Sequence, residues 1–353
     1  MIWHLLTGKR ASVVGAEWAA GLLRLVQLDL ARLEVIRLAE RRLAPGEKVN
    51  GEAVDSHQQA AFLRQVWRQA GFRGRDVYLS LGPGELFLQN IRLPQDAANV
   101  DAAVCAEVAN RIPYPLEEME LRYVPAGTVR QGENIRQEVI VFACQRKAIE
   151  HKLAVVDEAG LRCQGIDVHP AALLRCYRFQ LRREADRQQP IAFVSVRETG
   201  TLVVAGSREQ PYFVKSVEVT SGHFDEAVAR SLGLSVEEAA ALRRHQGDRR
   251  QDNRDPELSA AIAQATVAPL ERLAAEVALC LRYCSVTFRG QAPREIILSG
   301  AEATADHAEV LSRRLGVPVR AGNPFLPFKN APTAGIPGRW DIALGLALSK
   351  VNR

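Results

Sequence analysis

The segment Val13–Leu30 has the layout of a hairpin that could hold a phosphate group. Two apolar runs flank a turn region, which suits two strands joined by a tight connection. A turn that cradles phosphate directs several backbone N–H groups at one point, and this usually requires glycine and small hydroxyl residues. The turn Glu17–Gly21 reads EWAAG, so a carboxylate and an indole stand where the anion would approach. We therefore predict a phosphate hairpin that has lost its use.

Other residues that could carry chemistry are not arranged for it. The acids within Glu117–Glu120 resemble a carboxylate pair, but adjacent acids on a turn are usually solvated. Ser299 lies in Leu-Ser-Gly, whereas a nucleophile elbow needs glycine on both sides. Cys280 and Cys284 share a helical face, but without a nearby histidine or further cysteine they make a poor zinc site. None of the seven histidines has a spacing suited to a metal. We predict no catalytic residue and no metal site.

Composition indicates a globular protein with two lobes or domains. The chain has 353 residues, of which 47% are hydrophobic and 25% are charged, and a single core seldom grows past about 250–300 residues. A net charge of +5 is too diffuse to indicate nucleic-acid binding. No apolar run approaches the ~20 residues that span a bilayer, and the N-terminus lacks the order of a secretory signal. We expect a cytoplasmic protein with reduced, buried cysteines.

The elements that would position the hairpin occur twice along the chain. Up to Leu81 the pattern is a hairpin, a third strand, a helix and a strand, and a hairpin with a third strand restarts at Pro190. An insert at Gly82–Gly165 has the order strand, helix, strand, strand, helix. The charged run Arg243–Asp255 is typical of a solvated loop. The repetition predicts an α/β fold of two similar lobes with a cleft between them.

Four segments in this order resemble the type IV pilus assembly protein PilM family, a bacterial branch of the actin, FtsA and Hsp70 superfamily. They are IPYPLEEMELRY (Ile112–Tyr123), VFACQRKAIEHKLAVVDEAGLRCQGIDVHPAALLR (Val141–Arg175), SGHFDEAVARSLGLSVEEAAALRR (Ser221–Arg244), and IILSGAEA with NPF and ALGLAL toward the end. The resemblance implies a duplicated, RNase-H-like actin fold with an FtsA-type subdomain 1C. The domains implied are 1–81 (first lobe), 82–165 (1C-like insert), 166–189 (return helix of the first lobe) and 190–353 (second lobe, with a 2B-like part near 220–290).

Members of this superfamily bind ATP in the cleft through two hairpins and a glycine-rich turn. If binding is retained here, the resemblance assigns it to Gly15, Glu17, Gly21, Arg24, Ser195, Arg197, Gly222, Ser299 and Gly300. The motifs are degraded, however. The second hairpin reads Ser-Val-Arg at Ser195–Arg197 where Asp-Ile-Gly is usual, and the adenosine turn reads Gly-Ala-Glu at Gly300–Glu302 where three glycines are usual.

These changes weaken each part of a nucleotide site. Mg²⁺ needs one or two carboxylates around its water shell, and Glu17 could supply one whereas Ser195 cannot. Arg197 could pair with phosphate directly, but Glu302 brings a carboxylate close to where the nucleotide would lie. We expect ATP and Mg²⁺ binding to be weak or lost, and no hydrolysis.

The family resemblance also implies a partner, the N-terminal cytoplasmic tail of the membrane protein PilN, held in a groove formed by subdomain 1C and the neighbouring lobe. Such tails bind through backbone hydrogen bonds and apolar pockets. The candidate groove residues are Val104, Val108, Ile112, Tyr114 and Leu116. Val104 and Val108 are also typical of a subdomain core, whereas Tyr114 and Leu116 follow prolines on a rigid turn and suit a surface that meets a partner.

The interpretation is a cytoplasmic, actin-like scaffold of the pilus assembly platform. It would contact the inner membrane only through a PilN-like tail and other platform proteins, and self-association is left open. Two alternatives remain at this point: an active ATPase of the same superfamily, either a cycling PilM or an FtsA-like polymerising protein, and the cytoplasmic part of a related type II secretion or MSHA-type system. FtsA-like proteins end in an amphipathic helix and the L-like secretion proteins continue into a membrane span. We expect neither feature here.

Overall fold

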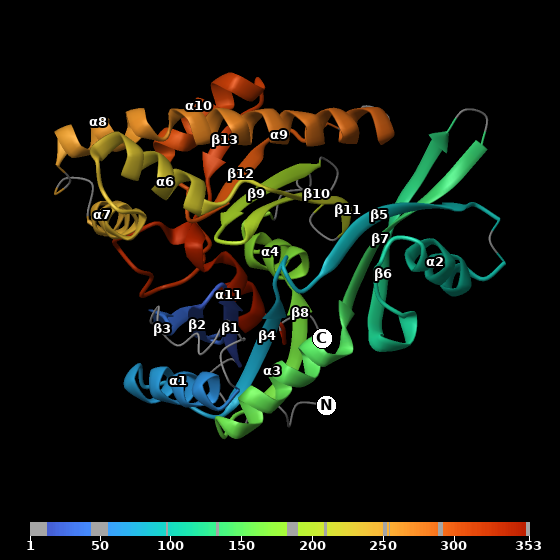
Figure 1. Ribbon diagram of the computed structural model, residues 1–353, viewed down its shortest axis with the longest axis horizontal. Helices are drawn as coiled ribbons and strands as arrows, with labels where there is room; N and C mark the ends of the chain where they lie inside the picture. The colour runs from blue at the N-terminus through green and yellow to red at the C-terminus, as the bar shows by residue number, and fades with distance from the viewer. Residues whose placement is uncertain are drawn as a thin grey trace.

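Two five-stranded sheets of the same topology form the frame of the protein, with a three-stranded insert beside them (Figure 1). The computed structural model describes residues 13–43, 56–96, 98–131, 134–181, 190–207, 210–249, 253, 255–288 and 292–350. The expected start of the first lobe before Val13 and the return helix beyond Leu181 lie outside the described residues.

The first lobe contains β1 (Val14–Ala19), β2 (Leu22–Asp29), β3 (Glu34–Arg42), α1 (Ser56–Gln69), β4 (Asp76–Leu81), α3 (Arg146–Glu158), β8 (Arg162–Val168) and α4 (His169–Tyr177). Its sheet has the order β3-β2-β1-β4-β8, in which β1 to β3 are antiparallel and the last two strands are parallel to β1. The β1–β2 turn has positive φ angles of 49° at Ala20 and 71° at Gly21. Two such residues match the right-handed twist of the flanking strands, so the predicted hairpin is confirmed.

The second lobe contains β9 (Ile191–Arg197), β10 (Gly200–Gly206), β11 (Pro211–Val217), α6 (Ser221–Leu232), α7 (Val236–Asp248), α8 (Pro256–Ala265), α9 (Val267–Thr287), β12 (Ile296–Gly300), α10 (Ala305–Leu315) and β13 (Val319–Ala321). Its sheet order, β11-β10-β9-β12-β13, repeats that of the first lobe. The duplicated two-lobe fold predicted from the sequence is therefore confirmed.

The chain then returns to the first lobe through the 3₁₀ turn η4 (Pro337–Trp340) and helix α11 (Asp341–Ala347). All seven residues of α11 are buried, and the helix packs against β1, β2 and α4. Figure 1 shows α4 and α11 at the centre of the molecule, between the two sheets. Two glycines permit this close approach: a Cβ on Gly15 would lie 2.0 Å from the carbonyl oxygen of Ala343, and one on Gly345 would lie 1.9 Å from that of Ala172.

The insert contains β5 (Phe87–Pro94), α2 (Val100–Ala109), the 3₁₀ turn η2 (Leu116–Glu118), β6 (Met119–Gln131) and β7 (Asn134–Gln145). Its sheet has the order β5-β7-β6 and its own apolar core. The insert is shorter than the predicted 82–165, because Val155 and Val156 of α3 belong to the first-lobe core and β8 is a strand of the first-lobe sheet.

The charged run at Arg243–Asp255 also differs from expectation. Helix α7 continues to Asp248, and the Arg243 side chain on it is 13% exposed and paired with carboxylates of the second lobe. The first part of the run is therefore a packed helix rather than a solvated loop. None of the helices that the structure describes is long and apolar enough to cross a membrane.

Candidate functional site: a charged cleft and an apolar groove

The first-lobe side of the cleft carries a row of charges across three neighbouring strands. Glu17 on β1 lies opposite Arg24 on β2, and Arg24 lies opposite Glu40 on β3. Opposite charges at directly paired positions of antiparallel strands attract each other. The Arg24 Nε donates to Glu40 at 2.7 Å, and its Nη1 lies 3.7 Å from Glu17. Glu17 and Arg24 are only 2% and 5% exposed.

The second lobe reaches into this row with Arg197, the last residue of β9. Its guanidinium donates to Glu17 and, at 2.7 Å, to Asp341 at the start of α11. Ser195, two residues earlier on the same strand face, donates to the other carboxylate oxygen of Asp341 at 2.9 Å and accepts from Arg197 at 3.1 Å. Arg197, Ser195 and Asp341 are almost completely buried.

A second arginine crosses the cleft in the opposite direction. Arg24 of the first lobe donates to Glu198, in the β9–β10 turn of the second lobe, at 2.8 Å. Arg339 in η4 extends the cluster, with its Nη1 3.7 Å from Glu40 and a further bond to Asp248. We call the residues Glu17, Arg24, Glu40, Ser195, Arg197, Glu198 and Asp341 the cleft cluster.

Burial and mutual attraction shift the titration of these groups. Burial lowers the pKa of both Arg24 and Arg197, but carboxylates, chiefly Glu198 for Arg24 and Asp341 for Arg197, outweigh it and raise the pKa of both. Burial would raise the pKa of Glu198, but Arg24 and Arg197 hold it at about 2. For Glu17 burial dominates and raises the pKa. The two arginines are therefore permanent positive charges inside the cleft.

The part of the cleft next to the turn Gly300–Glu302 is also filled by charged side chains. Arg243 on α7 donates to both carboxylate oxygens of Glu302 at 2.6 Å, and also to Asp225 on α6. Glu302 is 2% exposed. Thr220 caps the start of α6, and Ser221 rather than Gly222 lines the space that remains.

Little space is left between these groups. The cavity bounded by Arg24, Glu198, Arg243, Glu302 and Arg339 has a volume of about 80 Å³. A separate cavity of about 360 Å³ lies beside the β1–β2 turn. Its lysine, Lys152, is paired with Glu85 at 2.9 Å, so its charge is already compensated.

The structure brings together four of the residues predicted for nucleotide binding: Glu17, Arg24, Ser195 and Arg197. The other five serve the fold. Gly15 admits α11, Gly21 forms the hairpin turn, and Gly222 is the second residue of α6. Ser299 bonds to the Tyr177 hydroxyl at 2.7 Å, and Gly300, with a φ of 81°, lets the chain pass the carbonyl oxygen of Val196.

Sequence reasoning missed the residues that complete the cleft cluster, namely Glu40, Glu198 and Asp341, and it also missed Arg339 beside them. Asp341 had one signal, since it is an acid at the start of an otherwise apolar helix. The described residues contain no group of three or more His, Cys, Asp or Glu side chains placed to hold a metal ion.

A larger cavity of about 990 Å³ lies where the insert meets both lobes. The insert contributes Val124 of β6 and Phe142 of β7, the first lobe contributes Ile149 of α3 and Leu174 of α4, and the second lobe contributes Pro211 of β11. Charged residues also line this cavity: Glu120, Arg122, Arg146, Asp167, Arg175 and Arg178. We call this cavity the insert groove.

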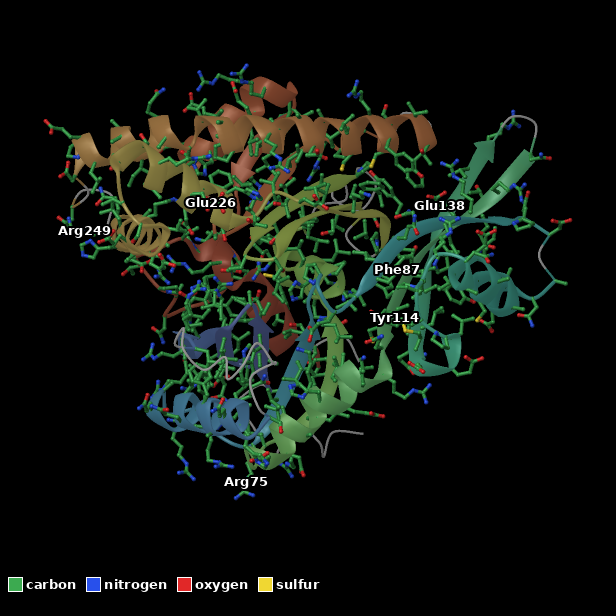
Figure 2. All side chains as sticks on the ribbon, in the orientation of Figure 1. Arg75, Phe87, Tyr114, Glu138, Glu226 and Arg249 are labelled. Atoms are coloured by element: carbon green, nitrogen blue, oxygen red, sulfur yellow. The ribbon has the colours of Figure 1, made fainter. Side chains whose placement is uncertain are left out.

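The predicted groove residues lie elsewhere on the insert. Val104, Val108 and Ile112 are at most 8% exposed and form the core between α2 and the insert sheet. This burial agrees with the alternative interpretation of Val104 and Val108 as subdomain core, because both lie on the face of α2 that packs against the insert sheet. Contact of the five residues with a peptide stays a prediction. Leu116 packs partly against the same core, and Tyr114 is 46% exposed on the preceding turn (Figure 2). Neither residue lines the insert groove.

The duplicated sheets, the helices between them and the inserted subdomain define an actin-like two-lobe protein. Across residues 19–350 the chain matches the family model described as type IV pilus assembly protein PilM. The chain belongs to this family.

Solved structures agree with that assignment. One, titled as a PilM-PilN type IV pilus biogenesis complex, has a TM-score of 0.77 and 25% identity, over 98% of this chain and 100% of that chain. The ethanolamine utilization protein EutJ of Carboxydothermus hydrogenoformans has a TM-score of 0.55 and 15% identity, over 97% and 90% of the two chains. MreB5 of Spiroplasma citri bound to AMPPNP has a TM-score of 0.52 and 10% identity, over 98% and 97%. The last two show the fold alone.

Proposed function

We propose that this protein is a scaffold of the type IV pilus assembly platform that holds the N-terminal cytoplasmic tail of a PilN-like inner-membrane protein in the insert groove. It works on the cytoplasmic side and meets the membrane only through that tail and other platform proteins. The observation that carries the proposal is the insert groove itself, together with the likeness to a protein solved with PilN.

The groove has the size and chemistry of a site for a peptide. Its volume of about 990 Å³ is at the upper end of the ~300–1,000 Å³ typical of ligand pockets. Apolar side chains from three parts of the molecule line it, and they can receive alternate side chains of an extended segment. Charged groups such as Arg146 and Asp167 line it as well and can fix the register of the segment.

The proposal includes weak or lost ATP binding and no hydrolysis. The residues of the cleft do not fit a nucleotide, because their own charges neutralise one another across the space that the phosphates would occupy. The 80 Å³ left beside Glu302 is well below the ~300 Å³ of a small ligand pocket. Binding would also require the Arg243–Glu302 pair to open, at the cost of two buried charge-assisted hydrogen bonds.

The test is fluorescence polarisation with a labelled peptide from the N-terminal tail of a PilN-like protein of the same organism. Val124→Glu places a charge on the apolar wall of the groove, and we expect it to weaken binding at least ~10-fold, since a desolvated charge without a partner costs more than 1.4 kcal/mol. The matched variant is Tyr114→Glu, on an exposed turn of the same insert outside the groove.

Equal loss of binding in both variants, or loss in Tyr114→Glu alone, would place the peptide on the η2 side of the insert and overturn the assignment of the groove. Absence of binding by the unmodified protein, at peptide concentrations that saturate a known PilM, would overturn the proposed partner. Both variants should melt cooperatively, which a thermal scan checks in the same samples.

A further inference from the structure

The charges of the cleft cluster are divided between the two lobes so that each lobe supplies an arginine to the other. Arg197 of the second lobe binds Glu17 on β1 and Asp341 on α11, which packs against the first-lobe sheet. Arg24 of the first lobe binds Glu198 of the second lobe at 2.8 Å. Separation of the lobes would break both bridges at once.

Because these bridges are buried, breaking them has a large effect on how the two lobes are held together. Side chains of Arg24, Arg197, Glu17 and Asp341 are at most 6% exposed, so water cannot readily replace their partners. An unpaired charge in such a place is far more costly than the pair. The bridges can therefore break only if the lobes separate far enough for water to solvate all four groups.

The cluster also contains Glu17, Arg24, Ser195 and Arg197, four of the residues to which the family resemblance would assign nucleotide binding. The guanidinium of Arg197 lies between the two hairpins, where it pairs with Glu17 on β1 and Asp341 on α11. Ser195 stands at the place of the usual second-hairpin aspartate and donates a hydrogen bond from its neutral hydroxyl to Asp341. The negative charge of Asp341 is therefore balanced by Arg197 alone.

We propose that the cleft cluster is a built-in lock that keeps the two lobes closed in the absence of nucleotide. The lock makes the closed arrangement a constant property of the chain instead of one set by ATP. This inference goes beyond the proposed function and does not depend on the partner peptide.

The lock is tested by the distance between nitroxide labels on the two lobes, measured by double electron–electron resonance. Gln58 on α1 and Gln264 on α8 are exposed, and Figure 1 shows the two helices far apart, α1 in the first lobe and α8 in the second. Both are replaced by cysteine in a background with Cys105→Ser and Cys163→Ser. The other four cysteines are buried and do not compete for the label.

We expect one narrow distance distribution for the otherwise unmodified protein without ligand, and no shift on addition of 5 mM Mg²⁺-ATP. The variant Arg197→Met with Glu17→Gln keeps much of the side-chain volume but removes both ion pairs of Arg197, and its distance distribution should broaden toward longer distances. The matched control is Arg111→Met with Glu107→Gln, which makes the same exchanges at an exposed pair at the C-terminal end of α2 and should leave the distribution unchanged.

Two results would overturn the lock. One is a broad distribution in the ligand-free protein that narrows with Mg²⁺-ATP, which would show that nucleotide closes the lobes. The other is a narrow, unshifted distribution in the folded double variant. If that variant does not melt cooperatively, Glu198→Gln replaces it. This change removes only the bridge from Arg24 and should cause a smaller broadening.

Discussion

The cleft and the insert groove both lie where separate parts of the chain meet, yet they are closed to different degrees. In the cleft the facing side chains are long and oppositely charged, and they reach across to leave a cavity of about 80 Å³. In the groove the facing side chains are mainly apolar and do not reach one another, so a cavity of about 990 Å³ remains between them. Charges of opposite sign close a gap because they attract over several ångströms, whereas apolar groups gain only on contact.

Helix α11 connects the two regions. Its first residue, Asp341, belongs to the cleft cluster, and one turn later the carbonyl oxygen of Gly345 accepts a bond of 2.9 Å from Arg175, which lines the groove. Because Gly15 and Gly345 allow backbone contact on both sides, α11 has little freedom to move relative to β1 and α4. The groove is thus lined by a helix, α4, that packs against the same rigid α11 whose first residue belongs to the cleft cluster.

The largest expected effect comes from removal of the central cleft charge alone. Arg197→Met leaves Glu17 and Asp341 buried without their cationic partner, and we expect a loss of about 3–5 kcal/mol in the free energy of unfolding. Urea unfolding at neutral pH measures it. The deficit should shrink as the pH falls, because the stranded carboxylates can then take up protons.

Addition of Glu17→Gln to this variant should restore part of the stability, since one stranded charge is removed. Arg111→Met, just after α2, is the control and should leave the unfolding midpoint unchanged, because its ion pair with Glu107 is exposed. A small loss in Arg197→Met, similar to that of the control, would mean that water solvates the cleft and that the comparison between closed cleft and open groove is wrong.

Much of the frame could be predicted from the sequence, because each part depends on a local pattern. Two apolar runs and the turn at Gly21 define the first hairpin, and the same pattern after Pro190 reveals the second lobe. The boundary of the insert was predicted less well. Val155 and Val156 give α3 an apolar face, but the sequence does not say which sheet that face covers.

Half of the cleft cluster was also within reach of the sequence. With Ala20 and Gly21 as a two-residue turn, the register pairs Glu17 with Arg24, so the charged cross-strand pair follows from the hairpin. The contact between Arg197 and Asp341 could not be predicted, because 144 residues separate the two and only the docking of the lobes brings them together. The insert groove depends on the same docking, so the residues that line it could not be identified from the sequence. The sequence analysis therefore proposed the buried Val104 and Val108 as peptide contacts.

A second prediction concerns the loss of folding stability at acid pH. Glu198 has a pKa of about 2 in the folded protein against an ordinary value of 4.5, and this difference corresponds to ~3 kcal/mol. Because the folded pKa is the lower one, the contribution is complete above pH ~4.5 and is lost as the pH falls toward 2. The raised pKa of Glu17 acts in the opposite direction, since protonation of that carboxyl relieves its burial.

Measurement of the unfolding free energy between pH 7 and pH 3 therefore distinguishes the contribution of Glu198 to stability from that of Glu17. Glu198→Gln should be less stable than the unmodified protein at pH 7, and the two should converge at acid pH. Glu309→Gln, at an exposed pair on α10, should keep the full pH dependence. A constant gap between Glu198→Gln and the unmodified protein would show that the bridge from Arg24 does not carry this energy.

The smallest expected effect concerns the nucleotide itself, and it sharpens the comparison most directly. A ligand present at its own dissociation constant stabilises a folded protein by only ~0.4 kcal/mol, and one at 100 times that value by about 2.7 kcal/mol. With the cleft filled by Arg197, Arg24 and their partners, we expect 5 mM Mg²⁺-ATP to change the melting temperature by less than ~1 °C and to give no binding heat in titration calorimetry. The tail peptide at saturating concentration should shift the same melt upward. Micromolar ATP binding would contradict this, because it would require Glu17 and Arg197 to release each other and rebuild a phosphate site from the same side chains that now close the cleft.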